Sequence, residues 1–266
     1  MSYQKELEFA KELAYEAGTI MRRYFRAEDI GIEWKEDNTP VTVADTKIND
    51  LVIQRVKKAF PKHGVLGEED SFEPERDIIW VIDPIDGTAT FSLGIPVSTF
   101  SIALVDRKDG QPVLAVVYEP QLDHLYTAVK GEGAFLNGDR LKAGKSKTLR
   151  NNYFFLGGGF KERAPTYKVG QCTDDLLSRG GKIIQVASFI YFGCKIASGE
   201  LSGAIIGLGT PWDLATVDLI VTEAGGKVTD LHGKSQRYDG PSEGFIAAET
   251  PEIHAELMAT VRRAKP

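Results

Sequence analysis

The sequence has few cysteines and no long apolar run. Cys172 and Cys194 are its two cysteines, and they do not form a C-x-x-C pair. Two isolated thiols make no disulfide framework, so the composition favours a reducing compartment such as the cytosol. No apolar stretch approaches the roughly 20 residues that a membrane-spanning helix needs. The charged N-terminal segment also lacks the apolar centre of a signal peptide. The sequence therefore predicts a soluble, cytoplasmic protein without a membrane partner.

The sequence also has few histidines and fewer basic than acidic residues. The four histidines are scattered and show no metal-ligand spacing. Lysine and arginine total 32 against 38 acidic residues, which gives a net charge of −6, and the basic residues form no block. This distribution argues against a nucleic acid polymer as partner.

The rest of the composition is that of an ordinary globular protein, and its apolar residues recur at regular spacings. The chain has 266 residues, of which 42% are hydrophobic and 26% charged, enough for one large domain or two lobes. Apolar residues at helical spacing predict helices over residues 5–25 and 44–59. An apolar run predicts a buried strand over 78–82. Turn signals then separate three further strands of an antiparallel meander, at 99–105, 113–118 and 125–129.

Beyond residue 146 the pattern changes to alternating strands and helices. The division suggests an N-terminal α+β lobe over residues 1–146 and a C-terminal α/β lobe over 147–266, joined in one compact unit. The elements predicted for the second lobe are strands at 153–156, 183–186 and 204–206 and helices at 190–197 and 214–223.

Two carboxylates follow directly after the buried strand. The segment Asp83-Pro84-Ile85-Asp86 starts where the apolar run ends. Because Pro84 lacks an N–H and restricts the residue before it, we expect the strand to stop or bend here. Asp83, Asp86 and the Ile85 carbonyl could then converge on a hard cation such as Mg²⁺ or Mn²⁺.

Other acidic and phosphate-binding groups surround this segment in the sequence. Gly87 allows close backbone approach, and Thr88 stands at an expected helix start, where free N–H groups can bind phosphate. Taken alone, each piece has an ordinary structural explanation. Asp and Gly are common in turns, the acidic run at residues 68–70 is typical of a solvated loop, and Asp213 is typical of a helix cap.

Together the segments resemble the inositol monophosphatase family. G-E-E-D at 67–70, W-V-I-D-P-I-D-G-T at 80–88 and P-W-D-L-A at 211–215 stand in the order and spacing of that family. The similarity covers most of the chain. It extends to V-T-V-A-D at 41–45, K-G-E-G-A-F-L-N-G at 130–138 and E-A-G-G at 223–226.

The resemblance implies a fold and an activity. The family folds as a layered α-β-α-β-α sandwich and usually forms homodimers. Its members hydrolyse small phosphate monoesters with water activated by two or three Mg²⁺ ions, which Mn²⁺ can replace, and lithium inhibits them. A catalytically idle metal-binding regulator on the same scaffold is an alternative, which the intact set of acidic residues disfavours.

The resemblance also implies metal ligands. Glu68, Asp83 and the Ile85 carbonyl would hold the first ion. Asp83, Asp86 and Asp213 would hold the second. Glu68 would reach a third, weaker ion through water.

Catalytic roles and phosphate contacts follow from the same resemblance. Asp45 paired with Thr88 would help to deprotonate the attacking water, with Glu68 as a further catalytic group. The backbone N–H groups of Gly87 and Thr88 would bind phosphate oxygens.

The segment before Pro211 departs from the family. Members that act on inositol phosphates commonly carry a glutamate about seven residues before the tryptophan-aspartate pair, and Ile205 or Ile206 stands there in this chain. We therefore expect Phe189, Ile205, Ile206 and Thr210 to lie near the leaving group. Because apolar side chains cannot pair the ring hydroxyls of inositol, the departure argues against inositol phosphate as the sole substrate. Relatives in the family handle histidinol phosphate, sugar bisphosphates and 3′-phosphoadenosine nucleotides, which are therefore alternatives.

Overall fold

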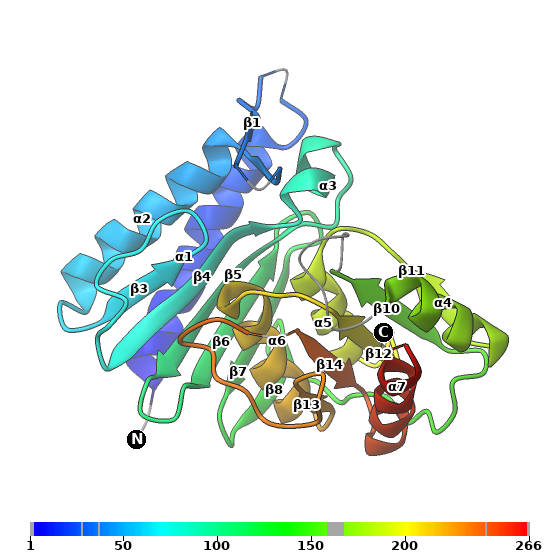
Figure 1. Cartoon of the computed structure of the whole chain (residues 1–266). Coiled ribbons are helices and arrows are strands. Elements are labelled where there is room, and N and C mark those ends of the chain that lie inside the picture. The colour runs from blue at the N-terminus through cyan, green and yellow to red at the C-terminus, as the bar shows by residue number, and fades with distance from the viewer. Residues whose placement is uncertain (1–2, 28, 37, 159–167, 243, 265–266) are drawn as a thin grey trace.

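The computed structural model describes residues 3–27, 29–36, 38–158, 168–242 and 244–264. Two β-sheets and the helices on their faces stack in five layers (Figure 1). Among these residues no helix is both long and apolar enough to span a bilayer.

A seven-stranded sheet forms the first β layer, in the order β3-β4-β5-β6-β7-β8-β9. β3 and β4 are parallel and every later pair is antiparallel, which confirms the predicted meander. The chain order and the spatial order agree because short turns can join only antiparallel neighbours. The strands are β3 (Gly64–Gly67), β4 (Ile78–Asp86), β5 (Thr99–Asp106), β6 (Gln111–Glu119), β7 (His124–Val129), β8 (Gly133–Leu136) and β9 (Asp139–Arg140).

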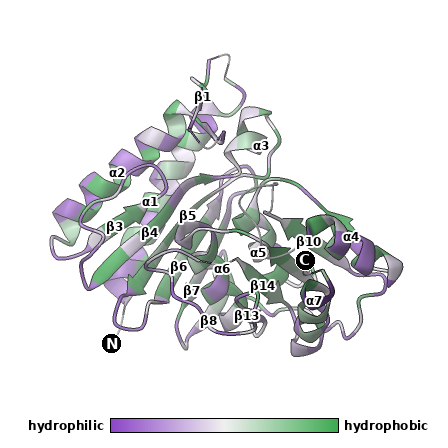
Figure 2. Ribbon diagram, viewed as in Figure 1, coloured by the Kyte–Doolittle hydropathy of each residue, from purple (hydrophilic) through white to green (hydrophobic). Residues whose placement is uncertain are grey.

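Two long helices cover the outer face of this sheet. α1 (Gln4–Tyr24) and α2 (Val43–Ala59) turn apolar residues inward, so polar and apolar colours alternate along them (Figure 2). Leu13 of α1 and Ile48 of α2 lie in one core with Trp80 of β4. The helical periodicity seen in the sequence thus corresponds to the buried faces.

Two further helices lie between the sheets. α5 (Phe189–Ala197) and α6 (Pro211–Glu223) belong to a core that includes Ile79 and Val81 of β4. α6 is buried on nearly all sides, because it contacts strands of both sheets. Helices on both faces of β4 explain why its sequence is continuously apolar instead of alternating.

A five-stranded sheet and two outer helices complete the sandwich. The order is β11-β10-β12-β14-β13, with β10 parallel to both of its neighbours. α4 (Val169–Ser178) and α7 (Pro251–Arg263) cover its outer face, so the predicted α-β-α-β-α layering is confirmed. The strands are β10 (Tyr153–Gly157), β11 (Lys182–Ile184), β12 (Gly203–Ile206), β13 (Lys227–Thr229) and β14 (Phe245–Ala248). The remaining elements are the hairpin β1 (Glu33–Trp34) and β2 (Pro40–Val41) and the short helix α3 (Thr88–Ser92).

Of the two outcomes expected at Pro84, the strand does not stop, but its pairing is irregular there. β4 continues through Pro84 to Asp86, and its pairing with β5 shifts register between Asp83 and Asp86. The missing N–H of Pro84 therefore interrupts the ladder without ending the strand. The sequence interpretation also missed α4, α7, β13 and β14. The proposed division after residue 146 stays a prediction. It falls between the two sheets, and α6 of the second half packs on the sheet of the first.

Candidate metal and phosphate site

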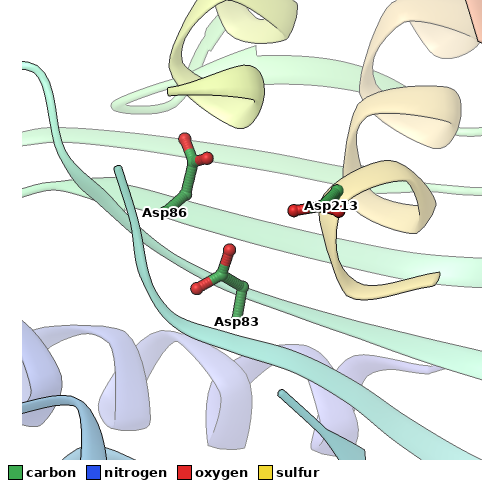
Figure 3. A group of neighbouring side chains, drawn as sticks. All are labelled: Asp83, Asp86 and Asp213. Atoms are coloured by element: carbon green, nitrogen blue, oxygen red, sulfur yellow. The ribbon is translucent and has the colours of Figure 1, made fainter. Parts of the chain in front are cut away.

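The end of β4 and the start of α6 bring three aspartates together. Asp83, Asp86 and Asp213 each offer a carboxylate oxygen, and these oxygens lie within 4.8 Å of one another. The side chains face a common space from the two elements (Figure 3). Asp83 and Asp86 are almost fully buried, at 2% and 4% exposure. Residues 127 positions apart in sequence have thus become neighbours within one acidic cluster.

The first turn of α5 holds the carboxylate of Asp86. The Ser188 hydroxyl donates to Asp86 Oδ2 at 2.6 Å. The backbone N–H of Phe189 donates to Oδ1 at 2.9 Å, and those of Ile190 and Tyr191 donate to Oδ2 at 3.0 and 3.2 Å. A helix N-terminus with unpaired N–H groups favours an anion, so this arrangement fixes the orientation of Asp86.

Two capping boxes hold the other carboxylates at helix starts. Asp213 Oδ2 accepts from the backbone N–H of Thr210 at 2.6 Å and from its hydroxyl at 2.7 Å. Asp45 Oδ2 accepts from the N–H and hydroxyl of Thr42 in the same way. Each aspartate is the third helical residue after its threonine, which is the spacing of a capping box. One oxygen of each carboxylate is thereby fixed while the other is directed toward the site.

Asp45 meets the start of α3 through Thr88. The Thr88 hydroxyl lies 3.1 Å from Asp45 Oδ1 and 3.0 Å from the Ile85 carbonyl oxygen. Gly87 precedes it with φ of +83°, and an added Cβ would lie 2.8 Å from the Ala187 carbonyl oxygen. Glycine is therefore required here both for the left-handed backbone and for the close approach.

Glu68 lies beside a lysine of the β1–β2 hairpin. The Lys35 ammonium lies 2.8 Å from Glu68 Oε1 and 2.6 Å from Glu69 Oε1. Burial alone would lower the pKa of Lys35, but the two glutamates raise it overall. The hairpin thus brings a positive charge to the rim of the acidic cluster.

Burial raises the pKa of Asp45 and of all three aspartates in the cluster. Burial brings the pKa of Asp45 and of Asp213 to about 7 and that of Asp86 to about 6, although hydrogen bonds to each carboxylate act in the opposite direction. Asp83 has a pKa well above its ordinary value, first through burial and then through Glu68 and the other aspartates. The site therefore carries more negative charge than its own residues neutralise.

Comparison with known proteins agrees with this geometry. The model of the inositol monophosphatase family matches residues 2–265. The chain belongs to this family. As a member it is a phosphoric monoester hydrolase, and the family resemblance of its sequence motifs is confirmed.

Relatives and solved structures cover nearly the whole chain. The histidinol-phosphatase of Chlorobaculum parvum is 34% identical over 91% of this chain and 92% of its own. The Nus factor SuhB of Pasteurella multocida is 31% identical over 96% and 95%. In structure, the IMPase of Thermotoga maritima superposes with a TM-score of 0.85 at 29% identity, covering 97% of each chain.

The residues of the site fit the Mg²⁺ ions that the family fold implies. Asp83 Oδ1 is buried and has no hydrogen-bond partner among the described residues. An unpaired buried carboxylate oxygen is costly, and a hard cation at this point would satisfy it. The donors gathered here are all oxygens, which are the ligands that Mg²⁺ prefers.

The residues expected near the leaving group divide into two groups. Phe189 is half-buried beside the site, and Thr210 orients Asp213 through its hydroxyl and N–H. Ile205 and Ile206 are at most 1% exposed and pack in cores on opposite faces of β12. Their side chains do not reach the site, so we do not include them among the proposed substrate contacts.

The sequence did not show that Thr42, Thr210 and Ser188 hold the carboxylates in place, although Thr210 was expected near the leaving group. Thr42 and Thr210 could have been found, because T-x-x-D before an apolar helical pattern is a capping-box signal. No local signal relates Ser188 to Asp86, since 102 residues separate them.

Proposed function

We propose that this protein hydrolyses a small phosphate monoester with Mg²⁺ and water. The observation that carries the proposal is the unpaired Oδ1 of buried Asp83, facing Asp86 and Asp213 in a cluster with excess negative charge. In an acidic cluster with a purely structural role, each buried carboxylate oxygen would be expected to have a hydrogen-bond or ion-pair partner within the protein. This one is arranged to receive cations.

Two or three Mg²⁺ ions would be held by the carboxylates and one carbonyl. Glu68, Asp83 and the Ile85 carbonyl form one proposed ligand set, and Asp83, Asp86 and Asp213 form the other. When bound, the ions supply positive charge for the phosphate and lower the pKa of water enough for attack near neutral pH. The helix-held orientation of Asp86 and Asp213 keeps these ligands from rearranging as the ions bind.

The chain's own groups position the water and the phosphate. In the proposed role, Thr88 passes its hydroxyl proton toward Asp45, and its oxygen is then free to accept a proton from the attacking water. The N–H groups of Gly87 and Thr88 would bind phosphate oxygens at the start of α3. Attack and departure then occur in line, without a covalent phosphoenzyme.

A metal-dependence assay over a panel of esters tests this function. Phosphate release should require Mg²⁺, stop on addition of EDTA, and return with Mg²⁺ or Mn²⁺. Full activity in a metal-free preparation, or no release from any ester in the panel with Mg²⁺ present, would contradict the proposal. The family also suggests inhibition by Li⁺ and a homodimer, which the same preparation can test by titration and by sedimentation.

Histidinol phosphate is a second candidate substrate. The relative from Chlorobaculum parvum bears the name histidinol-phosphatase at 34% identity. The similarity over nearly the whole of both chains favours the alcohol named there as a leaving group to test. The ratio of kcat/KM for histidinol phosphate and inositol 1-phosphate decides between the two.

A further inference from the structure

The loop that carries Glu68 follows β3 and turns back tightly on itself. Val65 of β3 and Phe72 exchange two backbone hydrogen bonds, of 2.7 and 2.9 Å, at the base of the loop. The Gly67 N–H also donates to the Ser71 hydroxyl at 3.2 Å. These contacts set the path of the loop, and the path decides where the Glu68 carboxylate can hold an ion.

Asn49 of α2 contacts both ends of this loop. Its Nδ2 donates to the Asp70 carbonyl oxygen at 3.2 Å. Its Oδ1 lies against Gly67, where an added Cβ would come within 2.6 Å of it. Gly67 and Asp70 flank Glu68 and its neighbour in the chain. One buried amide therefore connects both sides of the turn to α2.

Packing alone does not explain an asparagine at this position. Asn49 is 1% exposed, and the neighbouring residues Ala44, Ile48 and Val52 of α2 are fully buried and apolar. The Asn49 Oδ1 atom is buried and has no hydrogen-bond partner among the described residues. A buried acceptor without a partner lowers the stability of the fold, so an apolar side chain would pack better here. The amide is explained instead by the loop that it contacts.

The same helix carries Asp45, one turn before Asn49. Asp45 contacts the Thr88 hydroxyl at 3.1 Å, and residues four apart lie on one face of a helix. The Lys35 ammonium contacts the Glu68 carboxylate, whereas Asn49 holds the backbone on either side of that residue. α2 thus places two groups of the site, one through its own side chain and the other through the loop.

We propose that Asn49 is a positioning residue, which holds the loop so that Glu68 can share an ion with Asp83 and the Ile85 carbonyl. The inference rests on the proposed phosphatase function and concerns the same site. The Glu68 N–H donates at 3.3 Å to the carbonyl of Ile82, the residue before Asp83, so the loop and the β4 ligands are already neighbours. A loop that is ordered before the ion arrives need not be ordered by it, which strengthens binding.

Asn49→Leu removes the hydrogen bond to the loop and keeps the size of the side chain. Titration calorimetry with Mg²⁺, in the absence of substrate, should show an affinity about 10-fold lower than that of the wild type. At saturating Mg²⁺, kcat should stay within about 3-fold of the wild type, because Asn49 touches no reacting group. The unfolding temperature without Mg²⁺ should stay the same or rise, because leucine removes the unpaired acceptor and the carbonyl of exposed Asp70 can bond to water.

A double-mutant cycle shows whether Asn49 acts through Glu68. In a Glu68→Gln background, Asn49→Leu should have no further effect on Mg²⁺ affinity, because the ligand that it positions is gone. In an Asp213→Asn background it should keep its full effect, because Asp213 belongs to the other proposed ligand set. Val56→Ala is the matched control, since Val56 is buried on α2 two turns after Asn49. It should lower the unfolding temperature and leave the Mg²⁺ affinity unchanged.

The outcomes separate this inference from the function on which it rests. If the wild type neither binds Mg²⁺ nor releases phosphate, the proposed function fails. If the wild type does both but Asn49→Leu binds Mg²⁺ equally well, or weakens binding to the same extent in both backgrounds, the function stands and the role of Asn49 is overturned. Circular dichroism verifies that each variant is folded. Asn49→Ala removes the same hydrogen bond with a smaller side chain and gives the same test if leucine disturbs the fold.

Discussion

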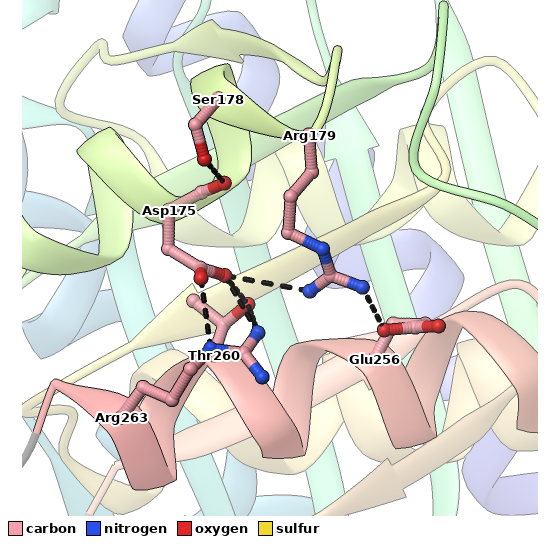
Figure 4. Close-up of polar contacts among 6 residues, drawn as sticks. All are labelled: Asp175, Ser178, Arg179, Glu256, Thr260 and Arg263. Atoms are coloured by element: carbon pink, nitrogen blue, oxygen red, sulfur yellow. Dashed lines mark hydrogen bonds and ion pairs between the residues drawn. The ribbon is translucent and has the colours of Figure 1, made fainter.

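Two clusters of charge in this molecule contain the same residue type in opposite electrostatic states. At the end of β4, burial and neighbouring acids raise the pKa of Asp83 well above its ordinary value. Between α4 and α7, hydrogen bonds from Arg263 lower the pKa of Asp175 to about 2. The first cluster gathers acids without enough cations, and the second pairs each acid with an arginine. Burying acids without matching cations lowers the stability of the fold, so the first cluster indicates a cationic ligand. The Asp175 network (Figure 4), called the balanced cluster below, needs none because Arg179 and Arg263 neutralise Asp175 and Glu256.

The largest expected effect comes from Asp83→Asn. The substitution keeps the shape and removes a charge placed between two proposed ions, so kcat should fall by at least about 100-fold. In metal-free protein at pH 8, the same change should raise the unfolding temperature, because it relieves repulsion within a buried cluster. Steady-state kinetics and calorimetry measure the two effects. A variant that keeps near-normal turnover at low Mg²⁺ would show that Asp83 is not between the ions.

The second prediction concerns how Mg²⁺ stabilises the protein at different pH values. In the folded, metal-free state Asp45 and Asp213 have pKa values of about 7, against 3.8 for an unperturbed aspartate. Between these values the folded chain holds protons that the unfolded chain releases, so stability falls as pH rises from about 4 to about 7. Mg²⁺ replaces those protons as the compensating charge.

The increase in unfolding temperature caused by Mg²⁺ should therefore be larger at pH 8 than at pH 5.5. Thermal unfolding with and without saturating Mg²⁺ at both pH values measures it. Ca²⁺ and Na⁺ at equal ionic strength serve as controls for general screening. An equal increase at both pH values would count against the acidic cluster as the binding site.

Asp175→Asn tests the balanced cluster. The change removes the bidentate pair with Arg263, which lies at the surface, so the cost should be about 1 kcal/mol. For a chain of this size that corresponds to a decrease in unfolding temperature of about 2–4 °C. Asp174→Asn is the matched control, since Asp174 is the exposed neighbour and should leave stability unchanged. Equal decreases for both variants would mean that the network in Figure 4 contributes no specific stability.

The smallest expected effect concerns His254, a buried residue of α7. Its ring lies 2.8 Å from the Thr229 hydroxyl, and burial lowers its pKa from 6.5 to about 4. Below pH 6.5 the unfolded chain takes up a proton here that the folded chain does not, so stability falls as pH drops from about 7 to about 4. His254→Gln should make that part of the stability profile less steep. A profile with unchanged slope would show that His254 titrates normally.

Much of the fold could be predicted from the sequence, because the spacing of apolar residues along a helix or strand indicates which of its faces is buried. α1 and α2 were recognised from their apolar faces, and β4 to β7 from apolar runs separated by turns. α4 and α7 were not recognised. Each has a short apolar face, and only its packing on the second sheet makes that face part of a core.

The order and spacing of the acidic motifs identified the family and predicted the group Asp83, Asp86 and Asp213, because both can be read directly from the sequence. Tertiary structure decided the rest. Packing placed Ile205 and Ile206 in cores instead of at the substrate, and it set the N-terminus of α5 against Asp86 across about a hundred residues. The physical reason is that a side chain's burial and charge state depend on which distant elements surround it, and a one-dimensional pattern does not record those neighbours.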